Sequence, residues 1–472
     1  MQIIKRLLLK DVLLLNIKIK KKRGSILSFL LMKTYMIKNN ILFLLIAVYL
    51  IAALLGYQIG WSVFQYDELR LLHFPLALCA LLILIFTKKI EYSISTQITF
   101  FLIGVLTAIQ ITTYSIFQFQ ELWSAIALLF IFSALAYDLK NVKNIAHGLA
   151  LIVISAFIPC LFIFISIFNF IIHQQWFDWQ FNSGTIRIYD SVIVPIFFFL
   201  IFLKNKNFPY FHYFYLFATF FFALAWFFDG ARSALLAVAI GLLFFFIYSL
   251  ENRKLILQSC IYIFLAFLVY KTTLYFADKN TMSVIRAGTS MRAEMWTFVF
   301  EQWKEKPWSG VGGGYLSKIQ YKYGHHIHNL YLRLIFEWGI VGCIFLVWMI
   351  YQVIKLFRDK NALPIAKAGV VAILVDAMFS GSMVYPASQM ACILFLAFAF
   401  SQRQQSKEYL KYPYRLTKLL IALWGAVFIY ITIVYLGQDL MCWGCGSYDG
   451  RMAPNFWFYG AAEHLIPSSK IP

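Results

Sequence analysis

Charged residues are scarce in this chain. Of its 472 residues only 13% are Asp, Glu, Lys or Arg, whereas 62% are hydrophobic. A soluble domain cannot hide that much apolar surface from water, so the composition excludes the soluble globular class. Acidic residues are the scarcer kind, with 21 Asp and Glu against 41 Lys and Arg. The composition therefore predicts a polytopic membrane protein with a positive net charge.

Several signatures of soluble enzymes are also missing. The chain shows no internal repeat, no low-complexity linker and no appended soluble domain. It has no Asp-x-Asp pair, which argues against a metal-dependent enzyme that uses nucleotide sugars. The glycine-rich run at 310–314 lacks the Lys and Ser or Thr that complete a phosphate loop. It predicts instead a flexible turn that lets backbone approach a ligand or a neighbouring helix.

The seven cysteines do not predict a zinc site. Cys442 and Cys445 form a Cys-Trp-Gly-Cys pair, with no second pair and no His nearby. A disulfide between them is the favoured interpretation. The other five lie in apolar runs and are expected to be small core residues, namely Cys79, Cys160, Cys260, Cys343 and Cys392.

The apolar residues gather in about thirteen runs. Backbone polar groups in lipid must be satisfied within their own segment, so each run predicts a helix of about 20 residues. The fold class is therefore all-α, a polytopic transmembrane helical bundle of about 12–13 spans. The run at 191–203 is short, and its helix is expected to be tilted, broken or longer. The runs cover residues 41–60, 70–87, 97–116, 121–137, 147–172, 191–203, 209–228, 231–250, 255–276, 329–356, 363–381, 386–401 and 416–436.

The connections between these runs alternate in charge. If the amino terminus is cytoplasmic, every inside connection carries Lys or Arg, as the positive-inside rule requires. These connections are 88–96, 138–146, 204–208, 251–254, 355–362 and 402–415. The expected organisation is a basic cytoplasmic tail at 1–40, a transmembrane domain at 41–436 and an outer tail at 437–472. Its two longer outer loops are 173–190 and 277–328, the second a helical loop before the tenth span.

The net charge of +20 predicts contact with membrane lipids and not with nucleic acid. Ten of the basic residues precede residue 39. One interpretation is a cytoplasmic tail that touches anionic lipid. A second is that translation starts at Met32 or Met36. The segment is too basic and too interrupted for a cleaved signal peptide.

The outer loop 277–328 holds most of the titratable groups beside the spans. Arg292 and Trp296 are one helical turn apart, so they share a face. One interpretation is an amphipathic helix that lies on the membrane surface. The other is an anion clamp, with Trp296 as a platform for a sugar or lipid. Arginine suits a diphosphate because its planar fork donates two parallel hydrogen bonds and stays charged.

Two further arginines stand at outer positions. Arg232 follows Asp229 and opens a span, so it is either a snorkelling cation paired with Asp229 or a substrate ligand. Arg187 lies in loop 173–190, three residues before Asp190. Both are candidates for binding an anionic group.

Three histidines, His325, His326 and His328, precede the tenth span. A metal site is disfavoured because no carboxylate or Cys accompanies them at close spacing. They are otherwise structural, or one acts as a general base or substrate ligand, because a neutral imidazole can accept a hydroxyl proton near pH 7. Asn329 is placed to orient His328.

Five motifs follow one another along the chain: Arg232-Ser233-Ala234, Arg292-x-x-x-Trp296, Pro307-x-x-Gly310-x-Gly312, His328-Asn329 and Gly339-x-x-Gly342. Together they resemble the O-antigen ligase family over about residues 180–345. The resemblance implies a multi-pass enzyme of the bacterial inner membrane that uses glycans carried on undecaprenyl diphosphate at the periplasmic face, without a metal or other cofactor. It also places the outer loops in the periplasm. The basic amino-terminal tail and the Cys442–Cys445 pair depart from the pattern.

The resemblance implies a role for each site residue. His328 would be catalytic, deprotonating or positioning the acceptor hydroxyl as it attacks the anomeric carbon. Fixed cations would stabilise the departing diphosphate. Gly310, Gly312, Gly339 and Gly342 would be structural. The substrate-binding residues would be Arg187, Arg232, Arg292, Trp296 and Asn329.

The sequence leaves alternatives open for the acceptor and for the class of protein. The expected acceptor is lipid A-core, but the superfamily also includes O-antigen polymerases and protein O-oligosaccharyltransferases that glycosylate pilins. A different class is a transporter of lipid-linked glycan, which would place charges near the membrane midplane and often repeats its halves. Asp376 is the clearest charge within a span, and the chain shows no repeat. Chemistry at the outer surface is therefore favoured.

Overall fold

The computed structural model is built of helices. It describes residues 41–57, 65–87, 93–110, 116–141, 145–174, 176, 179–180, 186–206, 208, 210–276, 291–319, 326–402 and 414–438, and these contain no strand. The predicted all-α class is confirmed. The predicted tail at 1–40 lies outside the described residues, and so does the predicted tail at 437–472 from residue 439 on, with Cys442 and Cys445. Residues 277–290 and 320–325 of loop 277–328, which include His325, and residues 175, 177–178 and 181–185 of loop 173–190 lie outside them too.

Each predicted apolar run coincides with a helix, except that the run at 147–172 forms two. The break falls at Leu161 and Phe162, beside Pro159. There the backbone N–H groups donate to the carbonyl three residues earlier, and not four as in an α-helix. The run at 191–203 is part of a longer helix. In chain order the elements are α2 (Ile41–Leu54), α3 (Gln65–Phe86), α4 (Ile94–Gln110), α5 (Ile116–Asn141), α6 (Ile145–Cys160), α7 (Ile163–His173), α8 (Ile186–Asn205), α9 (Phe211–Phe228), α10 (Arg232–Tyr248), η1 (Leu250–Asn252), α11 (Arg253–Phe276), α12 (Arg292–Glu305), α13 (Tyr315–Lys318), α14 (Leu330–Arg358), α15 (Pro364–Phe379), α16 (Pro386–Ser401) and α17 (Tyr414–Gln438).

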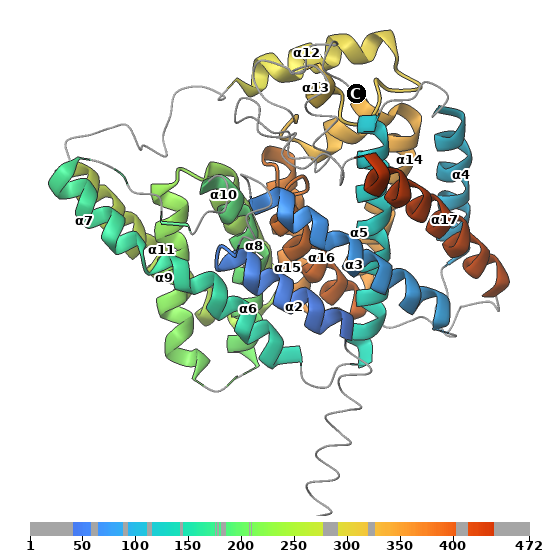
Figure 1. Ribbon diagram of the computed structural model, residues 1–472. Coiled ribbons are helices and arrows are strands. Elements are labelled where there is room, and N and C mark those ends of the chain that lie inside the picture. The colour runs from blue at the N-terminus through green and yellow to red at the C-terminus, as the bar shows by residue number, and fades with distance from the viewer. Residues whose placement is uncertain are drawn as a thin grey trace, which may run out of the picture.

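By length and composition, eight stretches of the described helices could cross a membrane, and four further apolar helices are shorter. The interior is most completely closed around α8, which packs against α6, α9, α15 and α16. Figure 1 shows α8, α15 and α16 in the middle of the bundle, with α4 and α17 at one side. The helices α11 and α14 keep most of their surface outside the bundle.

One end of the bundle carries a cap made by α12 and α13, which lie above the other helices in Figure 1. A small apolar core of its own holds this cap to α14. It contains Met295, Val299, Leu316, Ile327 and Phe336. Met295 and Val299 of α12 therefore pack on protein, whereas Phe300 on the same helix is exposed. The interpretation of α12 as a helix on the membrane surface stays a prediction.

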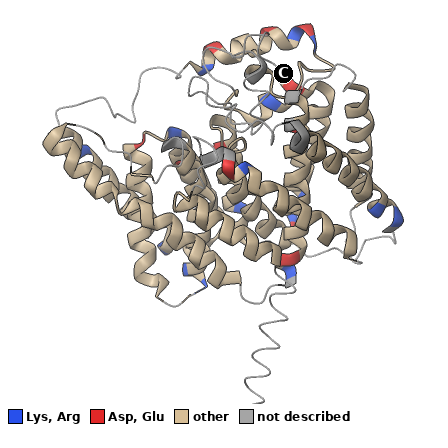
Figure 2. Ribbon diagram, in the orientation of Figure 1, with Lys and Arg blue, Asp and Glu red and all other residues tan. Residues whose placement is uncertain are grey.

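The opposite end of the bundle is held by lysines that cap helix carbonyl groups. Lys418, at the start of α17, donates to the carbonyl groups of Ile85 and Thr87 at 2.7 and 2.8 Å. Lys367 of α15 donates to the carbonyls of Phe357 and Asp359 at 3.1 and 2.7 Å. Cations are favourable at helix C-termini, where carbonyl groups lack partners. Figure 2 shows that charges are sparse along the middles of the helices and gather near their ends and on α12.

Candidate functional site

The two predicted glycine motifs meet where α14 is broken. Gly339 has φ 50° and ψ −124°, so the helix is interrupted there. The carbonyl groups of Phe336 and Glu337 accept hydrogen bonds from the N–H groups of Val311 and Gly312, both at 3.0 Å. In return the N–H of Ile340 donates to the carbonyl of Trp308 at 2.9 Å. The run at 310–314 therefore approaches a neighbouring helix, one of the two roles predicted for it.

Glycine is required at this junction for two reasons. Gly310 and Gly339 have positive φ, which side chains disfavour. A Cβ atom at Gly310 would lie 2.4 Å from the Glu337 carbonyl oxygen, and one at Gly339 would lie 2.3 Å from that of Trp308. At Gly342 it would lie 1.9 Å from the Leu334 carbonyl oxygen. These contacts are with backbone, which cannot move aside cheaply.

A buried charge cluster lies directly beneath the junction. Arg333 of α14 pairs with Glu121 of α5 at 2.5 Å and with Glu337 one turn further along α14 at 3.1 Å. The N–H of Gly314 also donates to the Glu337 carboxylate. Removing one partner from such a buried group leaves an uncompensated charge, so the cluster ties the first part of α14 to α5 and to the glycine run.

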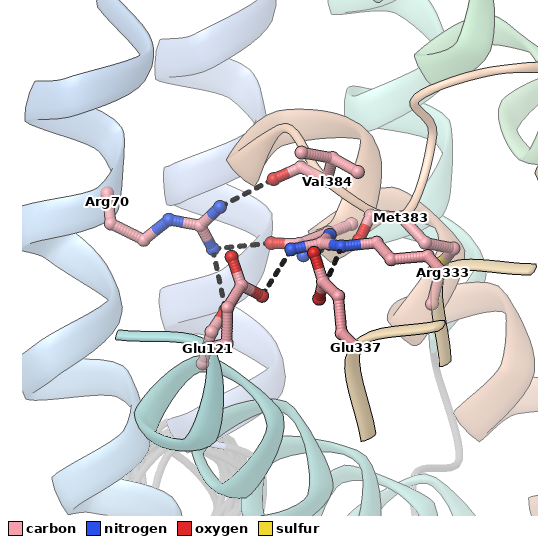
Figure 3. Close-up of polar contacts among 8 residues, drawn as sticks. Arg70, Glu121, Arg333, Glu337, Met383 and Val384 are labelled. Atoms are coloured by element: carbon pink, nitrogen blue, oxygen red, sulfur yellow. Dashed lines mark hydrogen bonds and ion pairs between the residues drawn. The ribbon is translucent and has the colours of Figure 1, made fainter. Parts of the chain in front are cut away.

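A second buried arginine reaches the same end from α3. Arg70 donates to the side-chain carbonyl of Gln389 at 2.5 Å and to the backbone carbonyl of Val384 at 2.6 Å. The amide of Gln389 donates in turn to the carbonyl of Met383 at 2.7 Å. Figure 3 shows Arg70 and Arg333 extending toward one another from α3 and α14, above Glu121 and Glu337.

His328 lies at the start of α14 in an unusual backbone conformation. Its φ is 54°, and its N–H donates to Nδ1 of His326 at 3.3 Å. The two imidazole rings are 3.9 Å apart between centroids. His326 is buried against the ring of Tyr385, whereas His328 is half-buried. Burial raises the pKa of Tyr385 to about 12, so its hydroxyl stays neutral beside His326.

Trp296 and Asn329 both hold the histidine segment. The Asn329 side chain caps α14 by accepting from the N–H groups of Tyr331 and Leu332, each at 3.0 Å. The indole N–H of Trp296 donates to the carbonyl of Ile327 at 2.9 Å. The polar atoms of these two predicted substrate ligands therefore make contacts within the protein. Trp296 is half-buried and packs against the small core of the cap.

Asp376 and a group of serines join three helix ends near the histidines. The carboxylate of Asp376 accepts from the hydroxyl of Ser380 at 2.8 Å, and Ser191 donates to Ser380 at 3.4 Å. The hydroxyl of Ser233 also approaches the Asp376 carboxyl group. Ser380 then leads into Gly381, where a Cβ atom would lie 2.7 Å from the His326 ring. The ends of α8, α10 and α15 therefore meet beside His326.

The predicted arginines fall around this end of the bundle. Arg232 is exposed at the start of α10, next to Ser233. Arg187 lies one turn before Ser191 on α8, but its side chain is outside the described residues. Arg292 begins α12 in the cap and is half-buried. Asp229, the partner considered for Arg232, accepts hydrogen bonds from Trp179 and Gln180 at 3.2 and 2.9 Å.

Sequence reasoning missed Arg70, Glu121 and Arg333 as part of this end of the molecule. A signal was present, because Arg70 and Glu121 are the first residues of two predicted runs and Arg333 is near the start of a third. All three of those starts were predicted to face the same side. Charged residues at the edge of a span are usually functional or paired. Here Arg333 pairs with Glu121, and Arg70 donates to Ser124 on the helix of Glu121.

These features define a multi-pass helical membrane protein with a polar site at one end of its bundle. Residues 217–347 match the O-antigen ligase family model, which confirms the resemblance seen in the motifs. The match supports a protein of the O-antigen ligase or polymerase type, whose family members are glycosyltransferase-like enzymes. Comparison with curated proteins returns no match.

The matched segment runs from α9 to the middle of α14 and includes most of the predicted site. Arg187 lies outside it. Within the described residues no group of three or more His, Cys, Asp and Glu is arranged to hold a metal ion. The matched site residues are Arg232, Arg292, Trp296, Gly310, Gly312, His328, Asn329, Gly339 and Gly342.

Proposed function

We propose that the protein is an O-antigen ligase-like glycosyltransferase. It moves a glycan from undecaprenyl diphosphate to a hydroxyl of lipid A-core at the periplasmic face of the bacterial inner membrane. The observation that carries the proposal is the placement of His328. It is half-buried at the polar end of the bundle, is held by His326, and lies within the segment that matches the family.

The proposed reaction is a displacement at the anomeric carbon of the lipid-linked sugar. The acceptor oxygen forms a bond to that carbon, and the bond to the diphosphate oxygen breaks. His328 accepts the hydroxyl proton or positions the hydroxyl, and a positioned base of this kind contributes about 10²–10⁴-fold. Arg187, Arg232 and Arg292 stabilise the charge that develops on the diphosphate. The activated donor supplies the driving force, so the reaction needs neither metal nor nucleotide.

The proposal includes an orientation in the membrane. The capped end faces the periplasm, and the amino terminus and the lysine-capped end face the cytoplasm. Residues 1–40 form a cytoplasmic tail and residues 41–436 the transferase domain, with periplasmic loops at 173–190 and 277–328. Residues 437–472 form a periplasmic tail in which Cys442 and Cys445 are oxidised to a disulfide. The positive-inside rule and the capping lysines support this orientation.

A reconstituted transfer assay tests the function. Purified protein in nanodiscs is given glycan on undecaprenyl diphosphate, with lipid A-core, a second lipid-linked repeat unit or a pilin peptide as acceptor. Transfer to lipid A-core is expected. Transfer only to the repeat unit or to the peptide would identify an O-antigen polymerase or a protein O-oligosaccharyltransferase instead. Movement of intact lipid-linked glycan across proteoliposomes, without transfer to any acceptor, would establish the transporter.

A further inference from the structure

The connection between α15 and α16, residues 380–385, is the surface on which His326 rests. We call it the seat loop. Gly381 lies so close that a Cβ atom there would be 2.7 Å from Cε1 of His326, and the Tyr385 ring meets the His326 ring edge-on with centroids 5.5 Å apart. His326 then accepts the N–H of His328. The position of His328 therefore depends on the seat loop through His326.

The seat loop is held from α3 and α16. Arg70 binds the carbonyl of Val384, and Gln389, which itself accepts from Arg70, binds the carbonyl of Met383. Two successive carbonyl groups of the loop are thus satisfied by one linked pair of side chains. Figure 3 shows Arg70 reaching the carbonyl group of Val384. Arg70 is in turn oriented by His73, whose Nδ1 lies 3.2 Å from the guanidinium.

The guanidinium fork suits this task because its two terminal nitrogens point at different acceptors at once. An ammonium group is a single point charge on a flexible stem and cannot reproduce the fork. Arg70 and Gln389 are both buried, so a carbonyl that loses its donor here has no ready access to water. Leaving buried polar groups without partners is costly, and the loop would rearrange to satisfy them.

We propose that Arg70 is a positioning residue for glycan transfer. It fixes the seat loop, the seat loop fixes His326, and His326 fixes His328. The proposal rests on the proposed function, because Arg70 matters for transfer only if His328 takes part in transfer. A displacement of about 1 Å at a reacting group costs about 10²-fold in rate.

The test uses the full chain in nanodiscs and two readouts. The variants are Arg70→Lys, which keeps the charge but loses the fork, and Gln389→Leu, which keeps approximate size but removes the link. Arg358→Lys is the matched control, because Arg358 is exposed at the opposite end of α14. One readout is kcat and KM for transfer. The other is the rate at which diethyl pyrocarbonate modifies His326, measured by mass spectrometry with exposed His212 as the internal standard.

Both Arg70→Lys and Gln389→Leu are expected to lower kcat by about 10-fold or more, toward the 10²-fold limit, with little change in the KM for the donor. His326, buried in the wild type, should be modified several-fold faster in both variants. Arg358→Lys should match the wild type in both readouts. A variant that only loses folding would instead lose thermal stability, which is measured beside both readouts.

Unchanged His326 modification in correctly folded Arg70→Lys and Gln389→Leu would overturn the proposal, whatever happened to transfer. The histidine readout does not need a substrate. Faster modification in a protein without any transferase activity would therefore uphold the link from Arg70 to His326 and refute the proposed function. Faster modification with unchanged kcat would show that the link exists but that it does not position the reaction.

Discussion

His328 occupies the left-handed backbone region at φ 54°, which residues other than glycine rarely adopt. Such a conformation costs of order 1–3 kcal/mol and persists only where the surroundings enforce it. Three contacts do so here: His326 accepts the His328 N–H, Asn329 caps α14, and Trp296 holds the Ile327 carbonyl. Strain maintained by this many contacts at a histidine supports a functional role for that residue.

The three histidines should differ in how much transfer depends on them. We expect His328→Ala to abolish transfer without lowering membrane abundance, because His328 is at a helix start and only half-buried. His326→Ala should be milder, and His325→Ala milder still. Chelation with EDTA should have little effect, because no step of the proposed reaction uses a metal. Equal loss in all three variants together with inactivation by EDTA would establish a three-histidine metal site instead.

Glycan transfer should depend on the shape of the arginine side chains as well as on their charge. Arg232→Ala and Arg292→Ala should lose most transfer while the protein still inserts, because a cation beside the departing diphosphate is lost. Arg→Lys at the same positions should also impair transfer, since an ammonium lacks the bidentate fork. Transfer rates measured at equal protein abundance check this. Lysine variants as active as the wild type would exclude a bidentate role.

At the scale of elements, α14 is two helices joined at a glycine. The first part carries Arg333 and Glu337 and begins at the histidine segment, while the second part continues to Arg358. The break frees carbonyl groups that a continuous helix would satisfy, and the run at 310–314 supplies their donors. The cap is therefore attached to the bundle through backbone hydrogen bonds at the point where the site begins.

Alanine at this junction should destabilise the protein strongly. Gly339→Ala would put a side chain at φ 50° and 2.3 Å from the Trp308 carbonyl oxygen. The backbone strain alone costs of order 1–3 kcal/mol. We expect a clear fall in the thermal unfolding temperature and in transfer. Gly104→Ala is the matched control, because a Cβ atom there would meet Trp424 at an ordinary 3.4 Å. Equal stability of the two variants would contradict the role assigned to the junction.

At the scale of the whole molecule, the two ends of the bundle differ in how they use charge. At the capped end, buried arginines bind carboxylates and loop carbonyls that come from other helices. At the opposite end, lysines bind carbonyls at the last turns of helices. The first arrangement builds a site of defined shape, and the second satisfies helix ends beside a membrane surface.

The orientation of the molecule makes a direct prediction. In a background without other cysteines, Ser317→Cys in the cap should react with an impermeant thiol reagent in intact spheroplasts. Asn361→Cys, exposed in the connection between α14 and α15, should react only after the membrane is lysed. The reverse pattern would invert the topology, and the proposed periplasmic reaction would be wrong with it.

The helices could be predicted because lipid imposes a local rule. A segment that crosses a membrane must be apolar and must satisfy its own backbone, and both properties can be seen in about 20 consecutive residues. The short run at 191–203 was underestimated because α8 begins among polar residues, including Asp190, which its neighbours bury. Apolar composition reveals a helix that lipid surrounds. It does not reveal the part of a helix whose polar residues are buried by other helices.

The sequence by itself determined the helical membrane class, the positions of the spans and the motifs of the site. Only the tertiary structure decided which residues support that site. Arg70 and Val384 are 314 positions apart, and Glu121 and Arg333 belong to helices that are not consecutive. Such pairs have no spacing that a sequence could reveal, because they follow from how helices pack. Buried charges must nevertheless find partners, and packing brought these partners to the end of the bundle where His328 lies.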